Sequence, residues 1–191
     1  MPAIHESGRS LPTAPEWTAR TLVPPPRSRY RRYVNAEFDV PRDPIAAVQR
    51  LKDIEEIAQL KARYFRFIDT KDWVAFRDLF TDDCRHHLPE ESPVPFMSND
   101  EYFPMMESML TNGVTTHHGH PPEITFINER EAEAIWPMHD YVQVDAPTGR
   151  VSIMGWGHYF ETYRKCDDGR WRISSKRNTR LLVDDVPWTL P

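Results

Sequence analysis

Apolar side chains recur at intervals of three and four residues over the segment 44–68, and this spacing predicts an amphipathic helix of about six turns. Asp43 followed by Pro44 suits the start of that helix, because Asp is a common N-cap and Pro is tolerated at the first helical position. The apolar stripe consists of Val48, Leu51, Ile54, Ile57, Leu60, Tyr64 and Ile68.

Two shorter helices are predicted downstream. The first follows residues 69–72 and carries three aromatic residues on one side, Trp73, Phe76 and Phe80. The second lies between residues 98 and 111, where Ser98 and Glu101 have the spacing of a capping box.

Beyond Gly113 the pattern is typical of strands, which we predict at 123–128, 131–142, 151–165 and 171–184, separated by turn sequences. Helices first and an antiparallel meander afterwards indicate an α+β fold. Long strands curl, and a curled sheet under helices forms a cone with a pocket inside. The expected fold is therefore a cone-shaped, curved antiparallel β-sheet covered by the N-terminal helices.

Proline is concentrated near the N-terminus, where residues 1–45 hold eight of the 18 prolines. We therefore divide the chain into an extended Pro/Arg-rich arm, 1–45, and a folded domain, 46–191, which is long enough to form its own core. Arg and Tyr are interleaved at 27–33, a pattern that can bind nucleic acid or acidic lipid. Because that signal is weak, we expect the arm to pack on its own domain or on a neighbouring subunit.

The overall composition excludes several classes of protein. A net charge of −5 argues against a nucleic-acid-binding domain, which usually shows a basic face. The mean hydropathy is −0.65 and no apolar run is long enough to span a membrane. The two cysteines, Cys84 and Cys166, have no CxxC partner, so we expect reduced thiols and a cytoplasmic protein.

Several polar side chains are candidates for chemistry. Tyr64 and Asp69 are five residues apart, or about 140° around a helix, so they face one cavity only if the helix breaks near Asp69. The alternative roles are an N-cap for Asp69 and core packing for Tyr64. In an extended segment, His118 and His120 share one side and His117 points to the other.

An imidazole that acts as a base needs a carboxylate on its other nitrogen, and the candidates are Asp69 and Asp140. Alternation places Asp140 on the same strand face as Trp136 and Met138, where an acid is costly unless it lies at the pocket or is held by an Arg. His139 falls on the opposite face, and we interpret it as structural.

The remaining candidates are less distinct. Arg180, near the end of the last strand, is either a solvated edge charge or the partner of an acid. His158 follows Gly155 and Gly157, which mark a bend or the close approach of another group. The set His118, His120, Glu123 and His158 is similar to the metal ligands of cupins, but its spacing departs from that pattern, so we predict no metal site. An apolar cavity is expected around Trp136, Met138, Met154 and Trp156.

Seven motifs follow one another in a fixed order: residues 60–73 (LKARYFRFIDTKDW), 79–83 (LFTDD), 116–124 (THHGHPPEI), 134–141 (AIWPMHDY), 155–163 (GWGHYFETY), 169–173 (GRWRI) and 179–181 (TRL). The series resembles the SnoaL-like branch of the nuclear transport factor 2-like superfamily over residues 48–184. The resemblance implies the cone-shaped barrel fold. It is nearest to the scytalone dehydratase and bile-acid dehydratase type, in which a His–Asp pair lines the pocket without a metal.

The resemblance implies that the catalytic residues are Tyr64, Asp69, His117, Asp140 and Arg180. His117, oriented by Asp69, would remove a proton next to a carbonyl, and Tyr64 would donate a hydrogen bond to the enolate. Asp140 or Arg180 would steer the leaving hydroxyl or the oxyanion. Trp136, Met138, Met154, Trp156 and His118 would bind the substrate, although a one-residue bulge would exchange His117 and His118.

Three functions are consistent with these residues. The first is a dehydratase-like lyase without a cofactor, acting on a hydrophobic oxygenated small molecule such as a polyketide, terpenoid or steroid. The second is a cyclase or isomerase of secondary metabolism that uses the same dyad. The third is a ligand-binding module, which is disfavoured because four polar groups in an apolar cavity would destabilise a pure binder. The resemblance also implies a homo-oligomer, a dimer or trimer, whose arm can wrap a neighbouring subunit.

Overall fold

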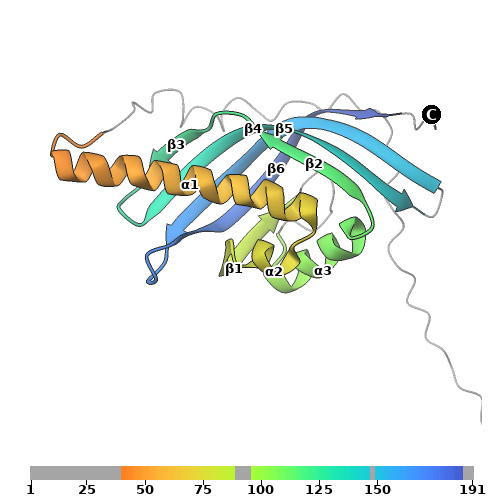
Figure 1. Ribbon diagram of the computed structural model, residues 1–191, viewed down its shortest axis with the longest axis horizontal. Coiled ribbons are helices and arrows are strands. Elements are labelled where there is room, and N and C mark those ends of the chain that lie inside the picture. The colour runs from red at the N-terminus through yellow and green to blue at the C-terminus, as the bar shows by residue number, and fades with distance from the viewer. Residues whose placement is uncertain (1–39, 89–95, 147–148, 187–191) are drawn as a thin grey trace, which may run out of the picture.

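A computed structural model describes residues 40–88, 96–146 and 149–186 (Figure 1). Its helices are α1 (Pro44–Thr70), α2 (Trp73–Arg77) and α3 (Asn99–Leu110). Its strands are β1 (Phe80–His87), β2 (Val114–Gly119), β3 (Glu123–Phe126), β4 (Glu131–Ala146), β5 (Gly149–Lys165) and β6 (Trp171–Asp185). The predicted arm lies outside the described residues up to residue 39.

The strands form one curved sheet in the order β1-β6-β5-β4-β2, and β3 also pairs with β4. Every pair is antiparallel except β1 with β6, which is parallel. The sheet is therefore mixed and unclosed, which corrects the expectation of a purely antiparallel sheet. The α+β class and the helix-covered curved sheet are confirmed, and Figure 1 shows α1 lying along one face of the sheet.

Helix α1 begins where the sequence predicts, with the Asp43 carboxylate accepting from the Ala46 N–H at 2.8 Å. The helix has 27 residues and is longer than predicted. Its first turns extend past the strands (Figure 1), so Val48 and Leu51 are exposed although they continue the apolar stripe. The later members of the stripe, from Ile57 to Ile68, are buried and pack on the sheet.

The two shorter helices are present, with one correction. Helix α2 ends at Arg77, so Phe80 is not on this helix but opens β1, which was not predicted. The N-cap of α2 is Asp72, whose side chain accepts from the Ala75 N–H. The capping box of Ser98 and Glu101 at the start of α3 is confirmed.

The face of the sheet that α1 covers is called the inner face below. Its centre lies on β4 and β5, where Ala134, Trp136, Met138, Tyr159 and Tyr163 belong to the buried core. Both cysteines are free. None of the helices in the described ranges has the length and apolar character that a membrane crossing requires.

Candidate active site

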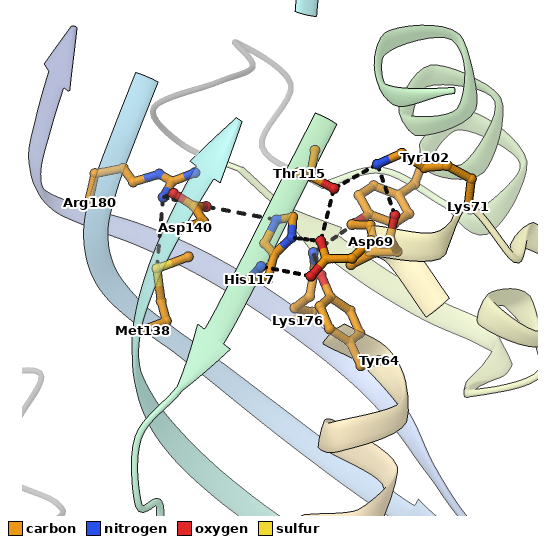
Figure 2. A network of polar contacts seen from close by, with 11 residues as sticks. Tyr64, Asp69, Lys71, Tyr102, Thr115, His117, Met138, Asp140, Lys176 and Arg180 are labelled. Carbon is orange, nitrogen blue, oxygen red and sulfur yellow. Dashed lines mark hydrogen bonds and ion pairs between the residues drawn. The ribbon is translucent and has the colours of Figure 1, made fainter. Parts of the chain in front are cut away.

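His117 and Asp69 form a hydrogen-bonded pair between β2 and the last turn of α1 (Figure 2). The distance from the His117 Nδ1 atom to the Asp69 Oδ1 atom is 2.6 Å. The backbone N–H of His117 also donates to Asp69 Oδ2 at 2.8 Å. Only 7% of the His117 side chain and 23% of the Asp69 side chain are exposed. The alternation argument is confirmed, because His117 points to the inner face and the predicted carboxylate binds it.

The tautomer of His117 follows from the state of Asp69. Burial of the Asp69 carboxyl raises its pKa, but hydrogen bonds from His117 and Thr115 and the nearby imidazole lower it further, so the net pKa is below the usual value. An ionised carboxylate can only accept hydrogen bonds. The proton of the neutral imidazole therefore lies on Nδ1, and Nε2 carries the free lone pair.

Two residues that the sequence did not single out hold Asp69 in place. The Thr115 hydroxyl donates to Asp69 Oδ1 at 2.8 Å and accepts from the Lys71 ammonium at 2.6 Å. Lys71 ends α1 with φ 61, a left-handed conformation that is uncommon for a residue other than Gly. Thr115 was detectable by parity, because it lies two residues before His117 on the same strand face.

Asp140 and Arg180 form the inner ion pair (Figure 2), with both carboxylate oxygens 2.8 Å from the Arg180 Nη1 atom. The exposed fraction is 1% for the Asp140 side chain and 6% for that of Arg180. Asp140 Oδ2 lies 3.9 Å from His117 Nε2, beyond hydrogen-bond distance. The prediction that Asp140 lies either at the pocket or on an Arg is confirmed, since Asp140 is held by Arg180 beside His117.

Two glycines on β5 make room for this pair. A Cβ atom at Gly155 would lie 2.6 Å from Arg180 Nη1 and 2.7 Å from Asp140 Oδ1. A Cβ atom at Gly157 would lie 1.8 Å from the Thr179 carbonyl oxygen, next to a shift in the β5–β6 register. The close approach that the sequence indicated at these glycines is confirmed.

Tyr64 lies in a separate buried cluster, the lysine cluster, formed with Lys176 of β6 and Tyr102 of α3. The Lys176 ammonium donates to the Tyr64 hydroxyl at 2.9 Å and to the Tyr102 hydroxyl at 2.8 Å (Figure 2). Burial raises the pKa of Tyr64 well above its usual value, so its hydroxyl keeps the proton. Because α1 continues unbroken to Thr70, Tyr64 and Asp69 point in different directions.

The four residues expected to line one apolar cavity lie on two different faces of the sheet. Trp136 and Met138 are buried on the inner face, where the Met138 sulfur lies 3.8 Å from Arg180 Nη1. Met154 and Trp156 pair with Tyr141 and His139, so they lie on the opposite face, which corrects the expectation of one shared cavity. The physical reason is parity, because Gly155 pairs with Asp140 and its neighbours on β5 point the other way.

His118 is also on the face of the sheet opposite the inner face, called the outer face below. This position corrects its expected role beside the substrate. It pairs with His139, and their rings stack with centroids 4.7 Å apart. His139 Nδ1 lies 3.3 Å from His120 Nε2. Among the described residues, no group of three or more His, Cys, Asp or Glu side chains is arranged to hold a metal ion.

A second buried ion pair, Lys61 with Glu161, lies deeper on the inner face. The Lys61 ammonium donates to Glu161 at 2.6 Å, and neither side chain is exposed. Glu161 also accepts from the Tyr163 hydroxyl, which in turn accepts from the Trp136 indole N–H at 2.9 Å. Burial lowers the pKa of Lys61 to about 8, and Glu161 opposes this shift. No local pattern in the sequence predicts this pair, since its members are 100 residues apart.

The domain that carries this site is similar to known proteins. The pattern of the SnoaL-like domain matches residues 49–177. A curated relative from Gibberella zeae, named "Probable cyclase FGR4", is 28% identical over 134 residues, which cover 65% of this chain and 89% of the relative.

Two solved structures show the same fold. A "Putative Scytalone Dehydratase" from Novosphingobium aromaticivorans is 21% identical with a TM-score of 0.64, covering 74% of this chain and 92% of that one. The hexachlorocyclohexane dehydrochlorinase LinA-type3 from Novosphingobium barchaimii is 14% identical with a TM-score of 0.63, covering 75% of this chain and 99% of that one.

Proposed function

The chain belongs to the SnoaL-like domain family, and from this premise we propose that it is a dehydratase-like lyase that uses the His117–Asp69 dyad without a cofactor. The observation that carries the proposal is the 2.6 Å bond between His117 Nδ1 and the Asp69 carboxylate. That bond fixes the tautomer in which Nε2 is a base.

The first step is the removal of a proton from a carbon next to a carbonyl group. His117 Nε2 accepts the proton, and the Asp69 carboxylate stabilises the imidazolium that forms. A positioned general base typically contributes about 10²–10⁴-fold to the rate. Thr115 and the His117 backbone N–H keep Asp69 in place, so little reorganisation accompanies the proton transfer.

The inner ion pair is the second functional group of the site. In this proposal, the Arg180 guanidinium stabilises the oxyanion that develops as the proton leaves, and Asp140 fixes its position. We assign the oxyanion to Arg180 rather than to Tyr64, because Tyr64 bonds to the lysine cluster and not to the dyad. The imidazolium then returns the proton to a leaving hydroxyl group, which departs as water.

The substrate class follows from the side chains around the dyad. Trp136 and Met138 are apolar and lie on the inner face next to Asp140, so a hydrophobic molecule suits the site. The base requires an acidic carbon, and the guanidinium suits an oxygen substituent. We therefore propose a hydrophobic oxygenated compound of the polyketide, terpenoid or steroid kind.

A cyclase or isomerase is the second candidate, and the Gibberella zeae relative named as a probable cyclase favours it. Both reactions begin with the same proton abstraction, so the dyad has the same role in each. They differ in mass balance, because elimination releases water and cyclisation or isomerisation leaves the mass unchanged.

The test compares the wild type with His117→Gln on metabolite extracts of the producing organism, followed by mass spectrometry without added metal or cofactor. His118→Gln is the matched control, because it makes the same change one residue away on the outer face. We expect one compound to lose 18 mass units with the wild type and the control, but not with His117→Gln. An unchanged mass with a new retention time would support the cyclase. Turnover by His117→Gln within a few-fold of wild type would refute the base assignment.

A further inference from the structure

Asn178 is a buried amide on β6. Its exposed fraction is 7%, and its Oδ1 atom has no hydrogen-bond partner among the described residues. A buried acceptor without a partner costs folding free energy.

The register of β6 places Asn178 between Arg180 of the inner ion pair and Lys176 of the lysine cluster. It lies two residues from Arg180 and two from Lys176, so the three side chains share one face. Successive positions on one strand face are about 6.6 Å apart. Its partner on β5 is Tyr159, which pairs in turn with Trp136. The inner ion pair, Asn178 and the lysine cluster therefore follow one another along one face of β6.

Asn99 provides a comparison, because all the hydrogen-bonding atoms of its side-chain amide have partners within the fold. Its Nδ2 atom donates to the backbone carbonyls of Thr81 and Asp82 at 2.9 and 3.0 Å. Its Oδ1 atom lies 2.8 Å from His86 Nε2. Unlike Asn99, Asn178 keeps an acceptor for which the described residues supply no partner.

We propose that Asn178 is a substrate-binding residue whose Oδ1 atom accepts a hydrogen bond from a second hydroxyl group of the substrate. This inference rests on the proposed function, which places the acidic carbon at His117. It narrows the substrate to a hydroxylated compound with a hydroxyl remote from the reacting carbon. A site with a dedicated acceptor discriminates against analogues that lack the donor.

The first test measures stability and needs no ligand. Asn178→Leu keeps the approximate volume and removes the unpaired amide, so we expect its melting temperature to equal or exceed that of wild type. Asn99→Leu, which removes an amide with three partners, is the matched control and should melt several degrees lower. A comparable loss of stability in Asn178→Leu would show a structural role and overturn the proposal.

The second test uses 2-naphthol and naphthalene as probes, because they share two rings and differ by one hydroxyl group. Binding is measured by ligand-observed NMR titration of the full chain. We expect Asn178→Leu to weaken 2-naphthol binding about fivefold, the value of a typical hydrogen bond, and to leave naphthalene within twofold. Equal losses for both probes, no loss for 2-naphthol, or no binding of 2-naphthol to the wild type would overturn the proposal.

The same titration of His117→Gln separates this inference from the proposed function. If His117 is the base, that variant loses turnover and still binds 2-naphthol through Asn178. If His117 is not the base, turnover survives in His117→Gln, while the Asn178→Leu results still decide whether the amide binds a hydroxyl.

Discussion

Asp69→Asn changes one atom of the dyad and leaves its shape intact, so it isolates the role of the charge. The carboxylate accepts three hydrogen bonds. Oδ1 accepts from the Thr115 hydroxyl and from His117 Nδ1, and Oδ2 accepts from the His117 backbone N–H. An Asn side chain has one acceptor oxygen and one donor nitrogen in these two places.

Only one orientation of the new amide is satisfied. The backbone N–H of His117 can only donate, so the amide oxygen has to take the position of Oδ2. The amide nitrogen then faces Thr115 and His117 Nδ1, where the hydroxyl can accept and Nδ1 is forced to accept. The imidazole proton moves to Nε2, and the lone pair that would remove the substrate proton is lost.

The magnitude follows from this tautomer change. A wrong tautomer in an equivalent His–carboxylate pair lowers turnover about 10⁴-fold, or about 5.5 kcal/mol in the activation free energy. The free energy of unfolding should change by only about 1 kcal/mol, because the hydrogen bonds are exchanged rather than removed. Asp72→Asn is the matched control, since Asp72 is an N-cap and Asn serves equally well there.

The assay for the tautomer is ¹⁵N NMR of the imidazole nitrogens, which requires no substrate. His117 should report a protonated Nδ1 in the wild type and in Asp72→Asn, and a protonated Nε2 in Asp69→Asn. Turnover is then measured on the compound found in the extracts. The proposed role of the Asp69 charge is refuted if Asp69→Asn keeps the Nδ1 proton, or if it changes the tautomer and retains turnover within tenfold.

Three further predictions concern the interior. Gly155→Ala would place a methyl group 2.6 Å and 2.7 Å from atoms of the inner ion pair, and we expect turnover to fall about 100-fold in kinetic assays while the chain still folds. Glu161→Gln would leave Lys61 as a buried cation without its counter-ion, so urea titration should show a loss of about 3–5 kcal/mol, most of it regained by adding Lys61→Met. Burial lowers the pKa of His86 to about 3, so the unfolded chain binds the extra proton between pH 6.5 and 3. Stability should therefore be full above pH 6.5 and fall with decreasing pH by up to about 1.4 kcal/mol per unit, and His86→Phe should flatten that profile.

Local patterns in the sequence were sufficient for much of the fold. The start of α1 depends on Asp43 and Pro44 alone, and the inner face of β4 follows from alternation around Asp140. By contrast, β1 is polar and makes its contacts with a strand far along the chain, Phe80 pairing with Ile173. No periodicity within residues 80–87 reports that pairing, so neither β1 nor its parallel direction could be predicted.

The site shows the same division between local and long-range information. Alternation predicts which residues of one strand share a face. It does not predict the register with the neighbouring strand, which decides which residues of that strand lie on the same face. Met154 and Trp156 were therefore grouped correctly with each other and wrongly with Trp136. Gly155 could have indicated the correct face. A residue without a Cβ atom is required where Asp140 and Arg180 approach the backbone of β5.

The two carboxylates beside His117 differ in their partners, and this difference defines what the site can do. Asp69 accepts from neutral donors and the imidazole, so its charge is left for the imidazolium. Asp140 is compensated by Arg180 and lies 3.9 Å from Nε2, so in the proposed mechanism it does not take the proton that Nε2 acquires. That proton is then free to return to the substrate. In the proposed mechanism, whether the proton returns to a leaving hydroxyl or to carbon depends on which substrate atom lies beside Nε2 when Arg180 holds the oxyanion. Elimination and cyclisation are thus alternatives decided by the pose of the substrate, which is why a residue that holds a remote hydroxyl, as proposed for Asn178, would decide the outcome.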